Sequence, residues 1–172
     1  MVSDIVEGWE LLETMVGVDV VEVVHSLHRD PGPLCRALAR YPQTLVHGDA
    51  FPGNLGLIGK AGAKVILLDW QLATALPPAV DLAQCLSDLR VADKEGAIAH
   101  YLHNLARRLG GPYDASWWRP QIALGALAFF VSRGWAMPLF VERWSAGEAE
   151  RAQQRTNLAW FAGQVRTATN WL

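Results

Sequence analysis

The sequence predicts an α+β domain that is mostly helical, with one short strand region near its middle. Short runs of aliphatic and β-branched residues, which are typical of strands, are confined to residues 44–70. Elsewhere the apolar residues recur at intervals of three and four, which is the spacing of a helix with one buried face. The chain has 172 residues, 51 % of them apolar, and this is enough for a single well-packed domain.

Helices are expected on both sides of the strand region, and several of them carry end signals. Pro33 suits the first turn of a helix, where its missing N–H is not needed. Asp93 is a typical N-cap, and Gly110 favours the left-handed turn that ends a helix. The expected helices cover residues 18–29, 33–41, 79–90, 93–110, 116–135 and 147–171.

Strands are expected at three places in the middle of the chain. They cover residues 44–48, 54–58 and 64–70. The segment GKAGA, residues 59–63, places two glycines between the last two strands and is typical of a hairpin turn. The sequence therefore predicts a small β-hairpin insert in a helical body.

Composition and charge exclude several classes of function. The net charge of −2 provides no basic field for nucleic acid. The acidic N-terminus lacks the features of a signal peptide, and the longest apolar run, residues 122–131, is too short to span a bilayer. We therefore expect a cytoplasmic protein with no nucleic-acid and no membrane partner. Cys35 and Cys85 lie far apart without CxxC spacing, so neither a disulfide nor a zinc site is indicated.

A set of polar residues follows the strand-like segments. His47, Gly48 and Asp49 are followed after four residues by Asn54, in the pattern HGDxxxxN, and Asp69 ends the later run VILLD. Phosphoryl transfer needs one carboxylate to orient a substrate hydroxyl, and it needs hard oxygen ligands to hold magnesium against the nucleotide phosphates. Asp49 could fill the first role, and Asn54 and Asp69 the second.

A simpler interpretation of the same residues is local. Asp49 and Asn54 could be turn residues around Pro52-Gly53, and Asp69 could be a polar strand end. Taken singly, each residue is explained as well by its turn chemistry as by catalysis. The complete arrangement of loop carboxylate, loop carboxamide, hairpin and second carboxylate favours phosphoryl transfer.

The segments HGDAFPGN and VILLDWQ resemble the catalytic and metal-binding segments of the aminoglycoside phosphotransferase and choline kinase-like family, which shares the protein-kinase fold. The resemblance covers roughly residues 44–86. It implies that Asp49 is the catalytic base and that Asn54 and Asp69 bind magnesium, with Trp70 in place of the phenylalanine that usually follows the second metal ligand.

Two further residues have supporting roles in this interpretation. The family usually has an aspartate at the start of the next helix, and here it falls on Asp81 in PPAVDLA, where it would brace the catalytic loop without touching the substrate. His47 is expected to be a buried residue that hydrogen-bonds the loop backbone, and not a proton carrier.

Two parts of a complete kinase are missing from the sequence. No glycine-rich phosphate loop precedes the HGD motif, and Lys60, Lys64 and Lys94 are in the wrong places for the lysine that pairs with the phosphates. We therefore expect residues 1–172 to be a single kinase-like C-terminal lobe, with the N-terminal ATP-binding lobe absent from this chain. A fragment, a standalone lobe and a lobe completed by a partner chain all fit. In each case the exposed lobe interface should be apolar and should favour self-association or a partner lobe.

Two functions from different classes follow. The first is an ATP-dependent phosphotransferase that uses magnesium and acts on a hydroxyl of a small molecule such as an aminoglycoside, choline or a sugar. The second is a non-catalytic kinase-like lobe that serves as a binding or interaction module. The sequence assigns no substrate contacts, because Glu142, Glu148 and Glu150 are also ordinary residues of solvated helix faces. The residues that would bind the ATP cofactor are likewise unknown.

Overall fold

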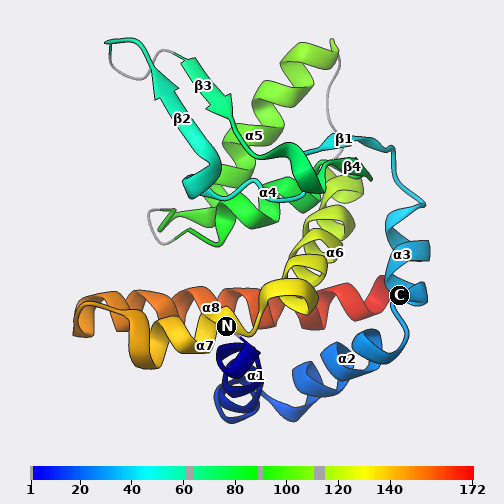
Figure 1. Ribbon diagram of the computed structural model, residues 1–172. Helices are drawn as coiled ribbons and strands as arrows, with labels where there is room; N and C mark the ends of the chain where they lie inside the picture. Colours follow the sequence, from blue (N-terminus) through cyan, green and yellow to red (C-terminus); the bar gives the residue numbers. More distant parts are fainter. Residues whose placement is uncertain (1, 61–63, 89–90, 111–114) are drawn as a thin grey trace.

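The computed structural model describes residues 2–60, 64–88, 91–110 and 115–172, and it shows a mostly helical body with two small strand pairs (Figure 1). The helices are α1 (Val2–Met15), α2 (Val18–Arg29), α3 (Gly32–Leu38), α4 (Ala79–Leu86), α5 (Lys94–Leu109), α6 (Ala115–Arg133), α7 (Ala136–Leu139) and α8 (Glu148–Ala168). The strands are β1 (Thr44–Val46), β2 (Leu55–Ile58), β3 (Lys64–Leu67) and β4 (Thr74–Leu76). The prediction of a mostly helical α+β fold is confirmed.

The core of the protein is built around α6, which packs most extensively against α4 and α8. Its apolar residues are buried on several sides, and Leu124, Leu127 and Phe130 are 0 % exposed. Burying each such side chain contributes about 1.5–3 kcal/mol to the free energy of unfolding. A Cβ at Gly125 would lie 2.4 Å from the carbonyl oxygen of Ala79, so glycine permits the close approach of α6 to α4. The helix that carries the apolar run is therefore the central core helix.

Two of the expected helices end earlier than predicted, for identifiable reasons. The helix expected over residues 33–41 ends at Leu38, because Pro42 disfavours a helical conformation in the residue before it. The helix expected over residues 79–90 ends at Leu86, whose carbonyl oxygen accepts a hydrogen bond of 2.6 Å from the Lys94 ammonium. Residues 89–90 lie outside the described part.

The helix-end signals are confirmed for α5. The Asp93 side chain accepts a hydrogen bond from the backbone N–H of Gly96, and Gly110 adopts a left-handed conformation with φ of 74°. α6 and α8 begin and end within three residues of the predicted bounds, and a 3₁₀ turn over Thr169–Trp171 follows α8. A π-helical turn, Phe140–Trp144, follows α7.

The four strands form two antiparallel pairs. β2 pairs with β3, with Leu55 opposite Leu67 and Ile58 opposite Lys64, so the predicted hairpin is confirmed. Its turn residues 61–63 lie outside the described residues. β1 pairs with β4, with Thr44 opposite Leu76. The sequence did not indicate β4, and this pairing joins segments that are 30 residues apart.

The first and third predicted strands are shorter than expected. The strand expected over residues 44–48 ends at Val46, because Gly48 turns the chain with φ of 78°. The strand expected over residues 64–70 ends at Leu67, and Asp69 then adopts a left-handed conformation. β1 thus ends directly before His47, and β3 ends two residues before Asp69.

In the part of the chain that the structure describes, no single helix has the length and hydropathy needed to cross a membrane. The required length and hydropathy are reached only by two segments taken together, Ser116–Arg133 and Ala136–Trp144, and these are separated by a bend of 71°.

Candidate functional site

The loop that follows β1 is fastened to α4 by the side chain of Asp81. The backbone N–H of His47 donates to Asp81 Oδ2 over 2.6 Å, and the backbone N–H of Gly48 donates to Oδ1 over 2.9 Å. Asp81 lies in the first turn of α4, so its charge also faces the positive end of the helix dipole. These contacts place Asp81 behind the loop, and its role as a brace stays a prediction.

A second α4 side chain, Gln84, holds the other end of the loop. Its amide oxygen accepts from the backbone N–H of Ala50 over 2.5 Å, and its amide nitrogen donates to the carbonyl oxygen of Gly48 over 2.7 Å. Gln84 follows Asp81 by three residues, so both side chains leave the same face of α4. The backbone on either side of Asp49 is therefore fixed. Sequence reasoning missed Gln84, and the signal was this i,i+3 spacing.

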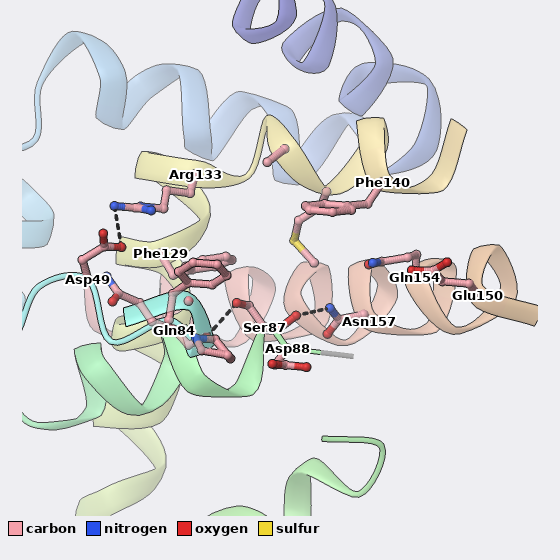
Figure 2. Close-up of a pocket in the computed structure, with 15 residues that line it drawn as sticks. Asp49, Gln84, Ser87, Asp88, Phe129, Arg133, Phe140, Glu150, Gln154 and Asn157 are labelled. Atoms are coloured by element: carbon pink, nitrogen blue, oxygen red, sulfur yellow. Dashed lines mark hydrogen bonds and ion pairs between the residues drawn. The ribbon is translucent and has the colours of Figure 1, made fainter. Parts of the chain in front are cut away.

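The Asp49 side chain has two partners, which come from different elements. Its Oδ2 accepts a hydrogen bond of 2.9 Å from the Asn54 side-chain amide, which also donates to the Asp49 carbonyl oxygen over 3.0 Å. Its Oδ1 lies 2.8 Å from Nη2 of Arg133, at the end of α6 (Figure 2). The structure thus brings Asp49 and Asn54 together. It also adds Arg133, for which the only sequence signal was a charge closing the longest apolar run.

His47 is buried, 1 % exposed, and its ring bridges the two strand ends. Its Nε2 lies 2.7 Å from the carbonyl oxygen of Leu68, and its Nδ1 lies 3.2 Å from the backbone nitrogen of Asp49. The carbonyl can only accept and the N–H can only donate, so the contacts assign the proton to Nε2 and leave Nδ1 as the acceptor. These contacts fit the structural role that the sequence predicts for His47.

Asp69 lies beside this group but makes no direct hydrogen bond with Asp49 or Asn54. The backbone N–H of Leu68 donates to the Asn54 carbonyl oxygen over 2.9 Å, and this bond places Asp69 one residue from Asn54 across the strands. Among the described residues, Asp69 alone combines a side chain with a positive φ, at 63°. Such a conformation costs on the order of 1–3 kcal/mol and recurs at functional sites. The Asp69 side chain is exposed.

A cavity of about 640 Å³ opens in front of Asp49. Figure 2 shows Asp49 and Arg133 at one end and Gln154 and Glu150 of α8 at the other. Its apolar wall is formed by Phe129, Met137 and Phe140, and its polar floor includes Ser87, Asp88, Gln154 and Asn157. Its volume lies within the range of small-molecule sites. Neither Asn54 nor Asp69 lines it, so the cavity lies on the Asp49 side of the motif.

Cys85 contacts the loop from α4, and the pKa of its thiol makes the stability of the protein depend on pH. Its Sγ donates to the Ala50 carbonyl oxygen over 3.2 Å. Burial, aided by the carboxylates of Asp81 and Asp88, raises the pKa of the thiol from 9.0 to about 11. Between these values the folded state binds more protons than the unfolded state, so stability falls as the pH rises.

We expect the free energy of unfolding of the wild type to fall, relative to that of Cys85→Ala, by about 1.4 kcal/mol between pH 8 and pH 10. Urea unfolding followed by tryptophan fluorescence measures this difference. The Cys35→Ala protein retains Cys85 and should behave like the wild type. A difference that does not change with pH would contradict the raised thiol pKa.

Comparison with known proteins gives one match. The model of the phosphotransferase enzyme family matches residues 18–118, more than half of the chain. No curated protein and no solved structure matches. The matched range includes Asp49, Asn54, Asp69 and Asp81, and the family resemblance predicted from the sequence is confirmed. With its HGDxxxxN loop pinned to α4 at the mouth of a cavity, this chain belongs to the phosphotransferase enzyme family.

Proposed function

We propose that this chain is the acceptor-binding and catalytic lobe of an ATP-dependent phosphotransferase that acts on a hydroxyl of a small molecule. The observation that carries the proposal is the position of Asp49. Its carboxylate is held by Asn54 on a loop with a fixed backbone, at one end of a cavity that can hold a small molecule. Catalysis of phosphoryl transfer depends mainly on positioning and charge stabilisation, and a carboxylate in this place would orient the hydroxyl and accept its proton.

Asn54 and Asp69 fit a magnesium ion by their chemistry. The Asn54 amide nitrogen is directed at Asp49, so its amide oxygen points away from Asp49 and is free to face a cation. The exposed Asp69 carboxylate lies one residue away across the strands. Both supply the hard oxygen ligands that magnesium prefers, and the bound ion would neutralise charge on the nucleotide phosphates. No described cluster of three or more His, Cys, Asp or Glu side chains could hold a metal, so waters and phosphates would complete the shell.

The hairpin next to Asp69 presents an apolar surface. Six large apolar side chains here are each at least 44 % exposed: Leu57, Ile58, Val65, Leu68, Trp70 and Leu72. An exposed apolar surface of this kind marks a binding or association site. We propose that an ATP-binding lobe, in the same protein or in a partner, covers this surface and holds the nucleotide over Asp69.

The cavity supports an acceptor alcohol that combines apolar and cationic parts. Phe129 and Phe140 offer ring surfaces. Asp88, near the middle of the cavity, and Glu150, at the end away from Asp49, offer carboxylates. Aromatic faces and carboxylates both attract ammonium groups. Among the acceptors considered, an aminoglycoside or choline fits this lining better than a neutral sugar.

One observation favours the alternative of a non-catalytic binding module. The Asp49 carboxylate, which a hydroxyl would need, is engaged by Arg133. A protein that retained the loop only as a scaffold would have no need to release this ion pair. The two functions differ in whether the Asn54–Asp69 pair still binds metal and nucleotide.

We expect Mn²⁺, used as a probe for magnesium, to bind weakly to residues 1–172 in the presence of ADP. Because the site offers few protein ligands, the loss of one in Asp69→Ala should weaken this binding at least about tenfold. Electron paramagnetic resonance of free Mn²⁺ measures the affinity. Glu142→Gln removes an exposed carboxylate outside the site and serves as the control. Equal binding by the wild type and Asp69→Ala would place the metal elsewhere and would favour the binding module.

A further inference from the structure

Both oxygens of the Asp49 carboxylate are already occupied in this structure. Oδ2 accepts the hydrogen bond from Asn54, and Oδ1 is covered by the Arg133 guanidinium at 2.8 Å. Oδ1 is shielded from solvent, yet its contact with Arg133 lacks the alignment of a hydrogen bond. Because Oδ1 is shielded from solvent, a hydroxyl can be oriented by this oxygen only if it takes the place of Arg133. The ion pair therefore keeps Oδ1 covered until an acceptor displaces Arg133.

Arg133 is well placed to leave Asp49. Its side chain is 40 % exposed, it lies at the last position of α6, and it lines the cavity. The other charged groups among the described residues that line the cavity are the carboxylates of Asp49, Asp88 and Glu150. Breaking a partly buried ion pair is costly unless the released charge finds a new partner. The guanidinium thus needs another anion close to Asp49.

The transferring phosphoryl group is an anion that must come to this place. A hydroxyl oriented by Asp49 lies about 2.5–3.0 Å from Oδ1, and the reacting phosphorus lies about 3–3.5 Å from the hydroxyl oxygen. The phosphoryl group is then within about 6 Å of Oδ1. Arg133 Nη2 lies 2.8 Å from the same atom, so we expect a rotation of its flexible side chain to bring it to the phosphoryl oxygens. Arginine binds such oxygens in a bidentate fork.

We propose that Arg133 is a further catalytic residue, which moves from Asp49 to the transferring phosphoryl group when the acceptor enters. The proposal rests on the proposed function. In the step, the hydroxyl oxygen forms a bond to the γ-phosphorus of ATP, and the bond from that phosphorus to the leaving oxygen of ADP breaks. The hydroxyl proton passes to Asp49. Arg133 stabilises the charge on the phosphoryl oxygens, and in the absence of acceptor it keeps the base covered.

The proposed movement of Arg133 from Asp49 to the phosphoryl group, here called the switch, can be tested without the acceptor and without an ATP-binding lobe. Inorganic phosphate, added to residues 1–172, should compete with Asp49 for Arg133. Asp49→Asn releases the guanidinium and removes a repelling charge, so it should tighten phosphate binding at least fivefold. Arg133→Met should weaken binding at least fivefold. In the double variant, Asp49→Asn with Arg133→Met, the tightening should vanish. Phosphorus NMR titration measures all four affinities.

The controls separate this switch from a structural role. Arg119→Met removes an exposed arginine from the same helix and should leave phosphate binding unchanged. Arg133→Lys keeps the charge but loses the fork, so it should bind phosphate more weakly than the wild type and more tightly than Arg133→Met. Should Arg133→Met fail to fold, as judged by circular dichroism, Arg133→Lys and Arg133→Gln replace it in the same comparison.

Two results would overturn the switch. One is equal tightening by Asp49→Asn with and without Arg133, which would assign the effect to the lost negative charge alone. The other is phosphate binding that is absent in every protein or insensitive to Arg133. The Mn²⁺ titration of Asp69→Ala tests the proposed function at different residues, so failure of the switch and failure of the function are distinguishable.

Discussion

Asp49→Asn is expected to lower ATP-dependent phosphorylation of an acceptor alcohol on the order of a thousandfold, when residues 1–172 are joined to an ATP-binding lobe. Asparagine has the shape of aspartate, and its oxygen can still accept the bond from Asn54 that holds residue 49 in place. The amide cannot accept the hydroxyl proton, so orientation survives while proton transfer is lost. A coupled assay of ADP release, with mass spectrometry of the product, measures the change.

The same assay tests what residues 1–172 achieve alone. We expect negligible transfer, because Asp49 can orient a hydroxyl only if the triphosphate is held in line, and the sequence contains no glycine-rich loop and no suitably placed lysine. Asp49→Asn should still bind Mn²⁺ and ADP, since the proposed metal ligands, Asn54 and Asp69, are unchanged. Substantial phosphorylation by residues 1–172 alone, lost in Asp49→Asn, would show that the missing parts are not needed.

Much of the local structure could be predicted from the sequence because its signals are local. The N-cap at Asp93, the left-handed stop at Gly110 and the β2–β3 hairpin each depend on a few neighbouring residues. Helix position followed from apolar spacing. Helix ends were less well predicted: the last carbonyl of α4, that of Leu86, is paired by the Lys94 side chain, which reaches back from the next helix.

The parts that were missed depend on contacts between distant segments. β4 has only three residues, and it becomes a strand by pairing with β1, 30 residues earlier in the chain. Arg133 approaches Asp49 only because α6 passes between α4 and α8 and ends at the cavity. No local pattern records such a contact. Gln84 was closer to prediction, because its spacing from Asp81 on a helix places both side chains on the face that meets the loop.

In the candidate site, too, the features that depend on local sequence could be predicted and those that depend on distant contacts could not. The HGDxxxxN spacing was enough to expect that Asp49 and Asn54 lie close together. In the structure the Asn54 amide nitrogen lies 2.9 Å from Oδ2 of Asp49. Asp69 was expected to bind magnesium together with Asn54, and this role stays a prediction. Its left-handed backbone could not be predicted, because it lies beside Leu68, whose backbone contacts His47 and Asn54 from other parts of the chain. The cavity could not be predicted, because its lining comes from α4, α6, α7 and α8 as well as the loop.

The largest effect on stability is expected from Asp81→Ala. The variant leaves the backbone N–H groups of His47 and Gly48 without an acceptor in a part-buried place. Hydrogen bonds to a charged group contribute about 1.5–3 kcal/mol each, so the loss of two should lower the free energy of unfolding by about 3–6 kcal/mol. This is a large share of the stability of an ordinary domain, about 5–15 kcal/mol. Urea unfolding followed by tryptophan fluorescence measures the loss.

Two further substitutions make this prediction specific to the brace. Asp81→Asn keeps one acceptor oxygen and should lose about half as much stability as Asp81→Ala, because one of the two N–H groups stays paired. Asp69→Asn changes an exposed carboxylate in a left-handed conformation that asparagine also adopts readily, so its stability should stay within about 0.5 kcal/mol of the wild type. If Asp81→Ala cost no more than Asp69→Asn, the loop would not depend on Asp81. The order Asp81→Ala, Asp81→Asn, Asp69→Asn follows from the number of N–H groups that each change leaves without an acceptor: two, one and none.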